Sequence, residues 1–515
     1  MSEDDKKKPT VYFDGDCPMC RAFVPYIDEP TNPDSAKFEN LRKAELPQGI
    51  ELQQAIDKIH LVTANGEVQK GAKAVFTALE VNKKFPFLVW LGRLPIISQL
   101  AEIVYSFIAR NRFLIFGPLQ RLYWIKLVLC IAFAVPLLIT RKLWLSDSFR
   151  FYALTPVSQA LPNITYPLDV LILGSMFTLL GAIFLSTNSR KYILLFCAIA
   201  FSYSLFDQSR WLPYNYQFFF MFLALSFVNW KTPEANTDKR IAAVTSCLAV
   251  ILFSIWFWSG LHKLNLKYFV VGFPWMISPF TTYAPYLRFL LGLAAIISTP
   301  IETGAALLLL QNKTRKVGVI LLCLMHIFIL LSIGPVGHNI NHSVWSWNIA
   351  QIILCWAIFW NNKELNFKQI LFGKTHLLVT TLFLIMPIFS YFSLWDDSLS
   401  HTLYSWNTRD AEIEIKSDAV ENQLPAEVKA SIRNLNGKKV LPILDWTYRS
   451  FNSSPYVSEK VYKNVFLKLC KHTQQFQDLE MIYFSKPLFN SLHANKSIYT
   501  CIETSGQITI GIKSE

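Results

Sequence analysis

Hydrophobic residues form long, nearly unbroken runs through the middle of the chain and short runs near both ends. An apolar segment of about 20 residues crosses the hydrocarbon core of a bilayer. The middle of the chain, residues 116–395, therefore predicts an all-α polytopic membrane domain of about nine helices. The expected spans are 122–140, 167–186, 191–206, 212–230, 241–260, 289–310, 316–337, 343–360 and 375–394.

The N-terminal segment, residues 1–115, has the pattern of a small α/β domain. Residues 9–14 are expected to form a buried strand and 17–27 a helix after a tight turn. Residues 58–63 and 67–70 flank Asn65-Gly66, a strong signal for a β-hairpin. The order strand, turn, helix and hairpin predicts a thioredoxin-like arrangement.

The C-terminal segment, residues 396–515, returns to the mixed composition of a soluble protein and predicts an α+β domain. Its expected strands are 411–416, 439–446, 481–485, 498–503 and 507–513, with one helix at 458–476. Cys470 and Cys501 lie in this domain. They form a disulfide if the domain faces an oxidising compartment, or they are unpaired core cysteines, because sequence gives no distance between them.

Composition supports the membrane assignment. Of the 515 residues, 52% are hydrophobic and only 17% are charged, which is too apolar for a water-exposed chain of this size. The formal net charge is +13, but Lys and Arg lie mainly at the ends of apolar runs. Anionic lipid headgroups explain them better than nucleic acid does. The bilayer is therefore the expected partner, and no nucleic acid is expected.

The distribution of cations predicts the orientation. Cations that mark every second connection are Arg110, Arg112, Arg121, Arg190, Lys191, Lys231, Lys239, Arg240, Lys313, Arg315, Lys316, Lys363, Lys368 and Lys374. By the positive-inside rule the N-terminal domain is cytoplasmic and the C-terminal domain extracytoplasmic, in a bacterial-type inner membrane. No apolar run follows the first charges, so no cleaved signal peptide is expected. A smaller group opposes the trend: Arg141, Lys142, Arg150, His262, Lys263 and Lys267.

The motif Cys17-Pro18-Met19-Cys20 is the first candidate for chemistry. A thiol at a helix N-terminus faces the positive end of the helix dipole, which favours thiolate and makes Cys17 the nucleophile. Cys20, one turn later, can resolve a mixed disulfide. Half of a zinc site and a structural pair are the alternatives. Structural zinc requires four ligands, and His60 is the only histidine of this domain.

These residues resemble the DCC-type thiol-disulfide oxidoreductases. The resemblance is carried by Tyr12-Phe-Asp-Gly-Asp-Cys-Pro-Met-Cys20, His60-Leu-Val, Gly66, Gly71-Ala-Lys-Ala74 and Ile108-Ala-Arg-Asn-Arg112. It implies a thioredoxin-like fold with Cys17 and Cys20 as the redox pair. For such a pair we expect protein or small-molecule thiols as partners and no required cofactor. One departure is clear. Thioredoxins place a proline just before the third strand, whereas Ile56-Asp57-Lys58 precede Ile59 here.

Ionisable residues inside the expected spans are the second candidate, since such groups are costly in a bilayer. Glu302 lies deep in the sixth span and His326 near the middle of the seventh. They either share one cavity or pair locally to fix helix packing. Lys263 follows Trp256-Phe-Trp258 at the end of the fifth span. It is either a desolvated general base or a lysine that reaches back to the interface.

The membrane segment resembles the vitamin K-dependent γ-carboxylase and its bacterial relatives, the horizontally transferred transmembrane (HTTM) proteins. The resemblance lies in 257–272, in Ile301-Glu302-Thr303-Gly304 with Thr314-Arg315, and in Cys323-Leu-Met-His326. It implies that Lys263 acts as the base. His262 departs from the family, which has a lysine at that position.

Other polar or sulfur-containing residues give weaker signals. His338 and His342 have i, i+4 spacing, which suits a metal if the segment is helical, but no third ligand is near in sequence. The cysteines in the expected spans lie singly, as packing residues usually do; they are Cys130, Cys197, Cys247, Cys323 and Cys355. No metal site is therefore expected.

The sequence as a whole predicts a membrane thiol-disulfide oxidoreductase that uses Cys17 and Cys20. The first alternative is a γ-carboxylase-like enzyme whose chemistry occurs around Lys263, Glu302 and His326, with the redox domain as an accessory. A transporter or an assembly scaffold is the second alternative. The sequence leaves open the oligomeric state and whether a quinone binds in the membrane domain.

Overall fold

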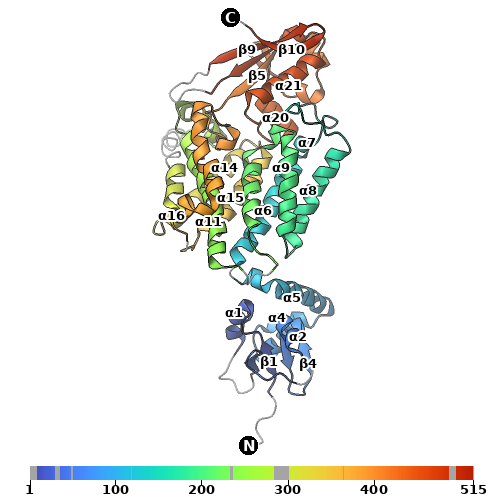
Figure 1. Cartoon of the computed structure of the whole chain (residues 1–515), viewed down its shortest axis with the longest axis vertical. Helices are drawn as coiled ribbons and strands as arrows, with labels where there is room; N and C mark the ends of the chain where they lie inside the picture. Colours follow the sequence, from blue (N-terminus) through green and yellow to red (C-terminus); the bar gives the residue numbers. More distant parts are fainter. Residues whose placement is uncertain are drawn as a thin grey trace, which may run out of the picture. The chain divides into compact units, whose positions relative to one another are not determined.

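The computed structural model describes residues 8–28, 35–47, 50–117, 119–231, 236–283, 301–363, 365–486 and 495–513 (Figure 1). The chain divides into two compact units. The first extends to Trp124, and the second covers Ile125–Lys231 and Asn236–Glu515. Each unit has its own sheet and its own buried core.

The first unit contains a four-stranded sheet with helices packed around it. Its elements are β1 (Thr10–Phe13), α1 (Pro18–Ile27), β2 (Lys37–Asn40), α2 (Leu52–Asp57), β3 (His60–Val62), β4 (Val68–Lys70), α3 (Gly71–Val81), α4 (Pro86–Gly92) and α5 (Pro95–Ile115). The strand order is β2-β1-β3-β4. Strand β1 is parallel to β2 and antiparallel to β3, which pairs with β4.

Local sequence explains these elements well. Val11 and Leu61 face one side of the sheet and pack with Ala74 and Ala78 of α3 into a buried cluster. Gly66 has a positive φ of 84°, which allows the tight turn between β3 and β4. The expected first strand, helix and hairpin are therefore confirmed. The small α/β sheet region of the prediction is present.

Helix α5 is the last helix of the first unit and packs against α3. The side chain of Glu102 accepts hydrogen bonds from Lys58 Nζ at 2.7 Å and from the backbone N–H of Ala72 at 2.8 Å. The hydroxyl of Tyr105 accepts the N–H of Ile59 at 2.8 Å. These contacts fix which face of α5 lies against the domain.

The second unit begins with a mostly helical part. Its helices are α6 (Gln120–Ile139), α7 (Arg141–Trp144), α8 (Leu168–Leu185), α9 (Arg190–Leu205), η1 (Gln208–Arg210), α10 (Pro213–Leu225), α11 (Asp238–His262), η3 (Tyr268–Gly272), α12 (Phe273–Tyr283), α14 (Arg315–Ile333), α15 (His342–Phe359), α16 (Phe367–Phe372), η5 (Lys374–His376), α17 (Leu377–Thr380), η6 (Thr381–Ile385), η7 (Met386–Phe392) and η8 (Ser398–Ser400). Residues 301–308 are also helical.

Five helices of the described residues are long and apolar enough to cross a membrane. They are Gln120–Ile139, Leu168–Leu185, Asp238–His262, Arg315–Ile333 and the continuous run Lys374–Phe392. A bent pair, α4 with α5 up to Arg112, passes the same test of apolarity across a 103° bend. These five correspond to the expected spans 122–140, 167–186, 241–260, 316–337 and 375–394.

The predicted count of nine spans is not confirmed. Helices α9 and α10 have 16 and 13 residues, which is short of the roughly 20 that a straight crossing needs. Helix α15 has 18 residues, but Asn348 and Gln351 are buried polar residues within it. Of the expected span 289–310, only residues from 301 lie in the described part of the chain.

The C-terminal part of the second unit is a six-stranded antiparallel sheet with helices on it. Its elements are β5 (Asp410–Ile415), α18 (Asp418–Gln423), α19 (Ala426–Lys429), β6 (Arg433–Leu435), β7 (Lys438–Pro442), α20 (Ile443–Phe451), α21 (Glu459–His472), η9 (Phe476–Asp478), β8 (Leu479–Phe484), β9 (Lys496–Thr504) and β10 (Gln507–Ile512). The strand order is β10-β9-β8-β5-β7-β6. Figure 1 shows these strands gathered at the end of the helical part near α7.

The expected C-terminal strands and the helix α21 are present, α18, α19 and β6 were not expected, and one strand is shorter than expected. Residues 439–446 were expected to form a single strand, but β7 ends at Pro442 and α20 follows. Proline has no N–H to continue the ladder. Ile443, Trp446, Thr447 and Phe451 are buried, and this spacing is helical.

Cys470 of α21 and Cys501 of β9 form a disulfide. This bond ties the helix to the sheet, and it decides between the two states that the sequence left open. Helix α21 also contacts the loop after α7, because Lys460 Nζ donates to the carbonyl of Pro156 at 2.8 Å and Lys468 pairs with Asp147 at 2.7 Å.

Candidate functional site

The Cys-x-x-Cys motif lies at the start of α1. Cys17 caps the helix, with Pro18 at its first position, and the Sγ of Cys17 accepts the backbone N–H of Cys20 at 3.3 Å. Proline is tolerated there because its missing N–H would have no partner inside the helix. The predicted position of the thiol at a helix N-terminus is confirmed.

The two thiols of this motif differ in acidity. A hydrogen bond from the Cys20 thiol, the N–H of Cys20 and the charge of Arg112 together outweigh burial and lower the pKa of Cys17 to about 7. The same hydrogen bond, with burial and the nearby Cys17 charge, raises the pKa of Cys20 far above its usual range. Cys17 is therefore the thiol that ionises first, as a nucleophile requires.

A buried carboxylate lies behind the motif. Asp14, at the end of β1, accepts hydrogen bonds from Arg42 Nε at 2.6 Å, and Arg112 Nη2 lies 3.7 Å from it. Burial raises the pKa of Asp14, but the hydrogen bonds from Arg42 and the N–H of Asp16 and the charges of both arginines lower it below its usual value. The carboxylate keeps Arg112 of α5 beside the cysteines.

Access to the two thiols is unequal. Cys17 has no exposed surface, whereas Cys20 is partly exposed. A protein disulfide can thus contact Cys17 only after the surrounding chain moves. Unlike thioredoxins, this chain has no proline just before β3. The N–H of Ile59, the residue at that position, donates to Tyr105, and a proline there would remove this bond.

The alternative that the motif is half of a zinc site requires further ligands close to the two cysteines. His60 is buried at the start of β3, and its Nδ1 is 2.8 Å from the carbonyl of Lys58, which suits a strand residue. Within the described residues no group of three or more His, Cys, Asp and Glu side chains is placed to hold a metal ion.

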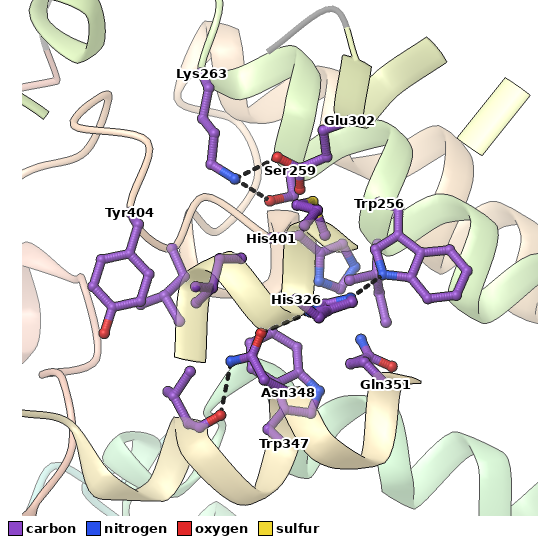
Figure 2. A pocket seen from close by; sticks show the side chains of 15 residues that line it. Trp256, Ser259, Lys263, Glu302, His326, Trp347, Asn348, Gln351, His401 and Tyr404 are labelled. Atoms are coloured by element: carbon purple, nitrogen blue, oxygen red, sulfur yellow. Dashed lines mark hydrogen bonds and ion pairs between the residues drawn. The ribbon is translucent and has the colours of Figure 1, made fainter. Parts of the chain in front are cut away.

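A second site is a small cavity in the helical part (Figure 2). Its volume is about 40 Å³. At roughly 10–15 Å³ for each molecule it has room for about three waters, and it is smaller than the roughly 150 Å³ cavity that admits a benzene ring. A quinone ring therefore enters only if lining side chains move. Lining side chains are Trp256, Ser259, Lys263, Glu302, His326, Trp347, Asn348, Gln351, His401 and Tyr404.

Lys263 and Glu302 form the charged wall of this cavity. The Nζ of Lys263 is 2.5 Å from Glu302 Oε2 and 3.1 Å from Ser259 Oγ, and both ionic side chains are buried (Figure 2). Gly260 makes the approach possible, because an added Cβ would lie 2.7 Å from the backbone N of Thr303. The structure brings together two residues that lie 39 positions apart in sequence.

His326 has both ring nitrogens occupied. Trp256 Nε1 donates to His326 Nε2 at 2.8 Å, and His326 Nδ1 lies 2.7 Å from Asn348 Oδ1. An indole N–H is only a donor, so Nε2 must be an acceptor and the proton is on Nδ1. His326 is therefore a neutral positioning residue in this arrangement, rather than a free acid or base.

Two other lining residues keep unpaired polar atoms. Neither ring nitrogen of His401 has a hydrogen-bond partner among the described residues, and Gln351 Nε2 has none either. Burial lowers the pKa of His401 to about 3, so the ring is neutral. These buried polar atoms suit a few water molecules or a small polar ligand.

The remaining sequence candidates do not form a site. His338 lies in a loop and α15 begins only at His342, so the helical spacing required for chelation is not present. His338 Nε2 is instead 2.7 Å from the carbonyl of Trp275. Among the span cysteines, Cys323 and Cys355 form a side-chain hydrogen bond across α14 and α15, which sequence separation alone could not reveal.

Sequence reasoning missed the burial and the partners of several charged residues. Lys126 of α6 donates to the carbonyl of Ser186 at 3.0 Å and to Ser189 Oγ at 2.9 Å, which caps the end of α8. Arg150 forms a fully buried ion pair with Asp207. In the N-terminal domain, Asp14 and Arg112 both belong to the motifs that carry the resemblance to the DCC-type family. Those motifs were the one sign in the sequence that the two residues belong to the site.

Comparison with known proteins gives a match for the N-terminal domain. Residues 11–118 match the family model of DCC1-like thiol-disulfide oxidoreductases. No curated protein and no solved structure matches the chain. The resemblance of the helical part to the γ-carboxylase and HTTM proteins stays a prediction. The chain carries a DCC1-like thiol-disulfide oxidoreductase domain at residues 11–118.

Proposed function

We propose that this protein is an integral membrane thiol-disulfide oxidoreductase. The cap position of Cys17 carries the proposal, since it joins a lowered pKa with a second thiol one turn away. The sheet order β2-β1-β3-β4, with its antiparallel β3–β4 hairpin, supports a thioredoxin-like fold for this domain.

The reaction follows from the two thiols. The Cys17 thiolate attacks one sulfur of a substrate disulfide, forms a mixed disulfide and releases the first substrate thiolate. Cys20 then loses its proton and attacks Cys17 Sγ. This step forms the Cys17–Cys20 disulfide and releases the second substrate thiolate, so two electrons pass from the dithiol to the substrate. Protein or small-molecule disulfides are the proposed substrate class.

A trapping experiment tests this assignment. In membranes from cells that express the full chain, Cys20→Ser should accumulate mixed disulfides at Cys17, because the resolving thiol is absent. The matched control Cys17→Ser should accumulate few. Diagonal gel electrophoresis with and without reductant detects the adducts. Equal adducts in the two variants, or none in either, would argue for a structural cysteine pair.

We also propose a membrane arrangement with three domains, 1–115, 116–395 and 396–515, and with the N-terminal domain in the cytoplasm. The five apolar helices support insertion. The Cys470–Cys501 disulfide supports an oxidising compartment for the C-terminal domain. The free thiols of Cys17 and Cys20 suit a reducing one.

A second candidate function is chemistry at the cavity of the helical part. The observation that favours it is the buried Lys263–Glu302 pair, which faces a cavity with unpaired polar atoms. In this arrangement the carboxylate stabilises the ammonium. Lys263 serves as a base only after its proton has moved, and Glu302 is the nearest acceptor. The pair, rather than the lysine alone, is the proposed unit.

A double substitution separates chemistry from packing. Glu302→Gln leaves a buried ammonium without its partner and should cost about 3–5 kcal/mol of stability. Adding Lys263→Met removes the unpaired charge and should restore most of the lost stability. If the cavity is catalytic, both variants fail to complement a deletion strain although the double variant unfolds at nearly the wild-type temperature. Full complementation by the double variant would leave the pair a structural role only. Cys17 alkylation should be normal in both.

A further inference from the structure

Helix α5 has a stripe of exposed large apolar side chains. Ile96, Leu100, Ile103 and Phe107 are 81%, 56%, 66% and 51% exposed. Their spacing of four, three and four residues puts them on one face of the helix. A soluble domain rarely leaves such a contiguous apolar face uncovered.

Helix α4 and the residue before it extend this surface. Phe85, Phe87, Leu88 and Trp90 are also exposed, at 57%, 68%, 48% and 57%. Only Val89 is buried in α4. We call these four residues together with the stripe of α5 the α4–α5 surface. It contains three phenylalanines and a tryptophan, and aromatic residues are typical of membrane interfaces.

The charges near the α4–α5 surface are mostly positive. Lys83, Arg93 and Arg110 are exposed, with Arg93 paired to Glu80 at 2.6 Å, and the one acidic residue between positions 86 and 115 is Glu102. The side chain of Glu102 is turned toward the domain, where it contacts Lys58 and Ala72. This arrangement complements an anionic lipid surface.

We propose that the α4–α5 surface lies in the headgroup region of the bilayer as an interfacial anchor. The position of this surface along the chain supports lipid as the molecule that covers it. Helix α5 ends at Ile115, and α6, the first apolar helix long enough to span, begins at Gln120. The end of α5 is therefore within a few residues of the membrane entry point of the chain. An apolar helix face with flanking cations inserts parallel to such a surface.

The contacts of α5 argue against a sixth span formed by α4 and α5. Glu102 and Tyr105 fix one face of α5 to the sheet domain, so lipid cannot surround the helix. Helix α4 has seven residues, too few to cross. The 103° bend between the two helices also suits a surface that follows the interface. This proposal does not depend on redox activity.

A photo-crosslinking amino acid in the full-length protein tests the anchor. p-Benzoylphenylalanine at Ile103, irradiated in native membranes, should yield phospholipid adducts that mass spectrometry identifies. The matched control is Ser98, which is exposed on the opposite face of the same helix, and it should yield few. An adduct with a second copy, an adduct with another segment of the chain, or no adduct at Ile103 would overturn the proposal.

A second variant tests whether the stripe itself holds the helix. With the crosslinker at Phe107, the double change Ile96→Glu and Leu100→Glu should lower the lipid adduct yield by roughly tenfold, because two apolar side chains that contact lipid in the proposed anchor are lost. Ser98→Glu should leave the yield unchanged. An unchanged Cys17 alkylation rate shows that the domain is folded. Equal yields in the two variants would also overturn the proposal.

Discussion

Cys17 and Cys20 are the same chemical group, and only their surroundings make them different. The Sγ of Cys17 accepts hydrogen bonds from the N–H and the thiol of Cys20, and Arg112 is nearby. The thiol of Cys20 is the donor in this pair. One helix end thus creates an ionised thiol and a protonated one three residues apart. This division is what a two-step exchange needs.

The pH dependence of alkylation follows from this difference. The rate of Cys17 alkylation by iodoacetamide should rise with pH and reach half its maximum near pH 7, because the thiolate is the reacting form. Cys20→Ala removes the largest cause of the lowered pKa, so the midpoint should move upward toward the ordinary 9.0. Mass spectrometry of the Cys17 peptide gives the rate. If the midpoint pH of Cys17 alkylation is the same in Cys20→Ala as in the wild type, the hydrogen-bond explanation is wrong.

The sequence singled out candidate site residues more readily than it indicated their roles. Cys17, Cys20, Lys263, Glu302 and His326 were all singled out because thiols in a Cys-x-x-Cys motif and charges in spans are rare enough to notice. Roles depend on partners that are distant in sequence. The Trp256 and Asn348 bonds that fix His326, and the Glu302 carboxylate beside Lys263, arise only when four helical segments meet.

At the scale of the elements, the close contact of α11 with residues 301–308 depends on Gly260. A methyl group there would lie 2.4 Å from Thr303 Oγ1 as well as close to the backbone. Gly260→Ala should separate the two segments and cost about 1–3 kcal/mol of stability, and it should lengthen the Lys263–Glu302 contact.

Thermal unfolding in detergent measures the effect of Gly260→Ala. The matched control is Gly174→Ala in α8, where an added Cβ meets nothing within 4 Å. That change should be neutral or slightly stabilising, because alanine favours a helix over glycine. If Gly260→Ala is as stable as the control, the close approach does not hold the cavity together.

Elements with strong local signals were predicted well, and those that depend on distant packing were not. The hairpin at Gly66 and the start of α1 follow from turn and cap residues. Helices α9 and α10 are apolar but short, and hydrophobicity alone does not show where a helix stops. Helix α20 was read as strand because a short apolar run suits either structure.

At the scale of the molecule, two of the cations that oppose the topology trend have local explanations. Arg150 is fully buried against Asp207 and donates to the carbonyl of Leu143 at 2.9 Å. Lys263 is buried against Glu302. A cation that is paired inside the protein does not contact lipid headgroups, so it carries no topology information. Arg141 and Lys142 are exposed and still oppose the trend, so the orientation stays a prediction.

That orientation gives the last prediction, which uses the two sets of cysteines as reporters. If the C-terminal sheet is extracytoplasmic, Cys470 and Cys501 stay bridged in intact cells, and a membrane-impermeant maleimide labels them only after reduction. Cys17 and Cys20 are free thiols, so if the N-terminal domain is cytoplasmic the same reagent labels them only after lysis. Mass spectrometry of the two regions measures both.

Fusion reporters provide the control for this labelling. A reporter placed after Lys416 should behave as extracytoplasmic and one near residue 5 as cytoplasmic, because the cations mark opposite sides for the two ends. Cys470→Ser with Cys501→Ser removes the labelled pair without moving either reporter. Labelling of Cys17 in intact cells, or both reporters on one side, would contradict the orientation. The apolar helices and the Cys17 chemistry would still stand, since neither depends on which side each domain faces.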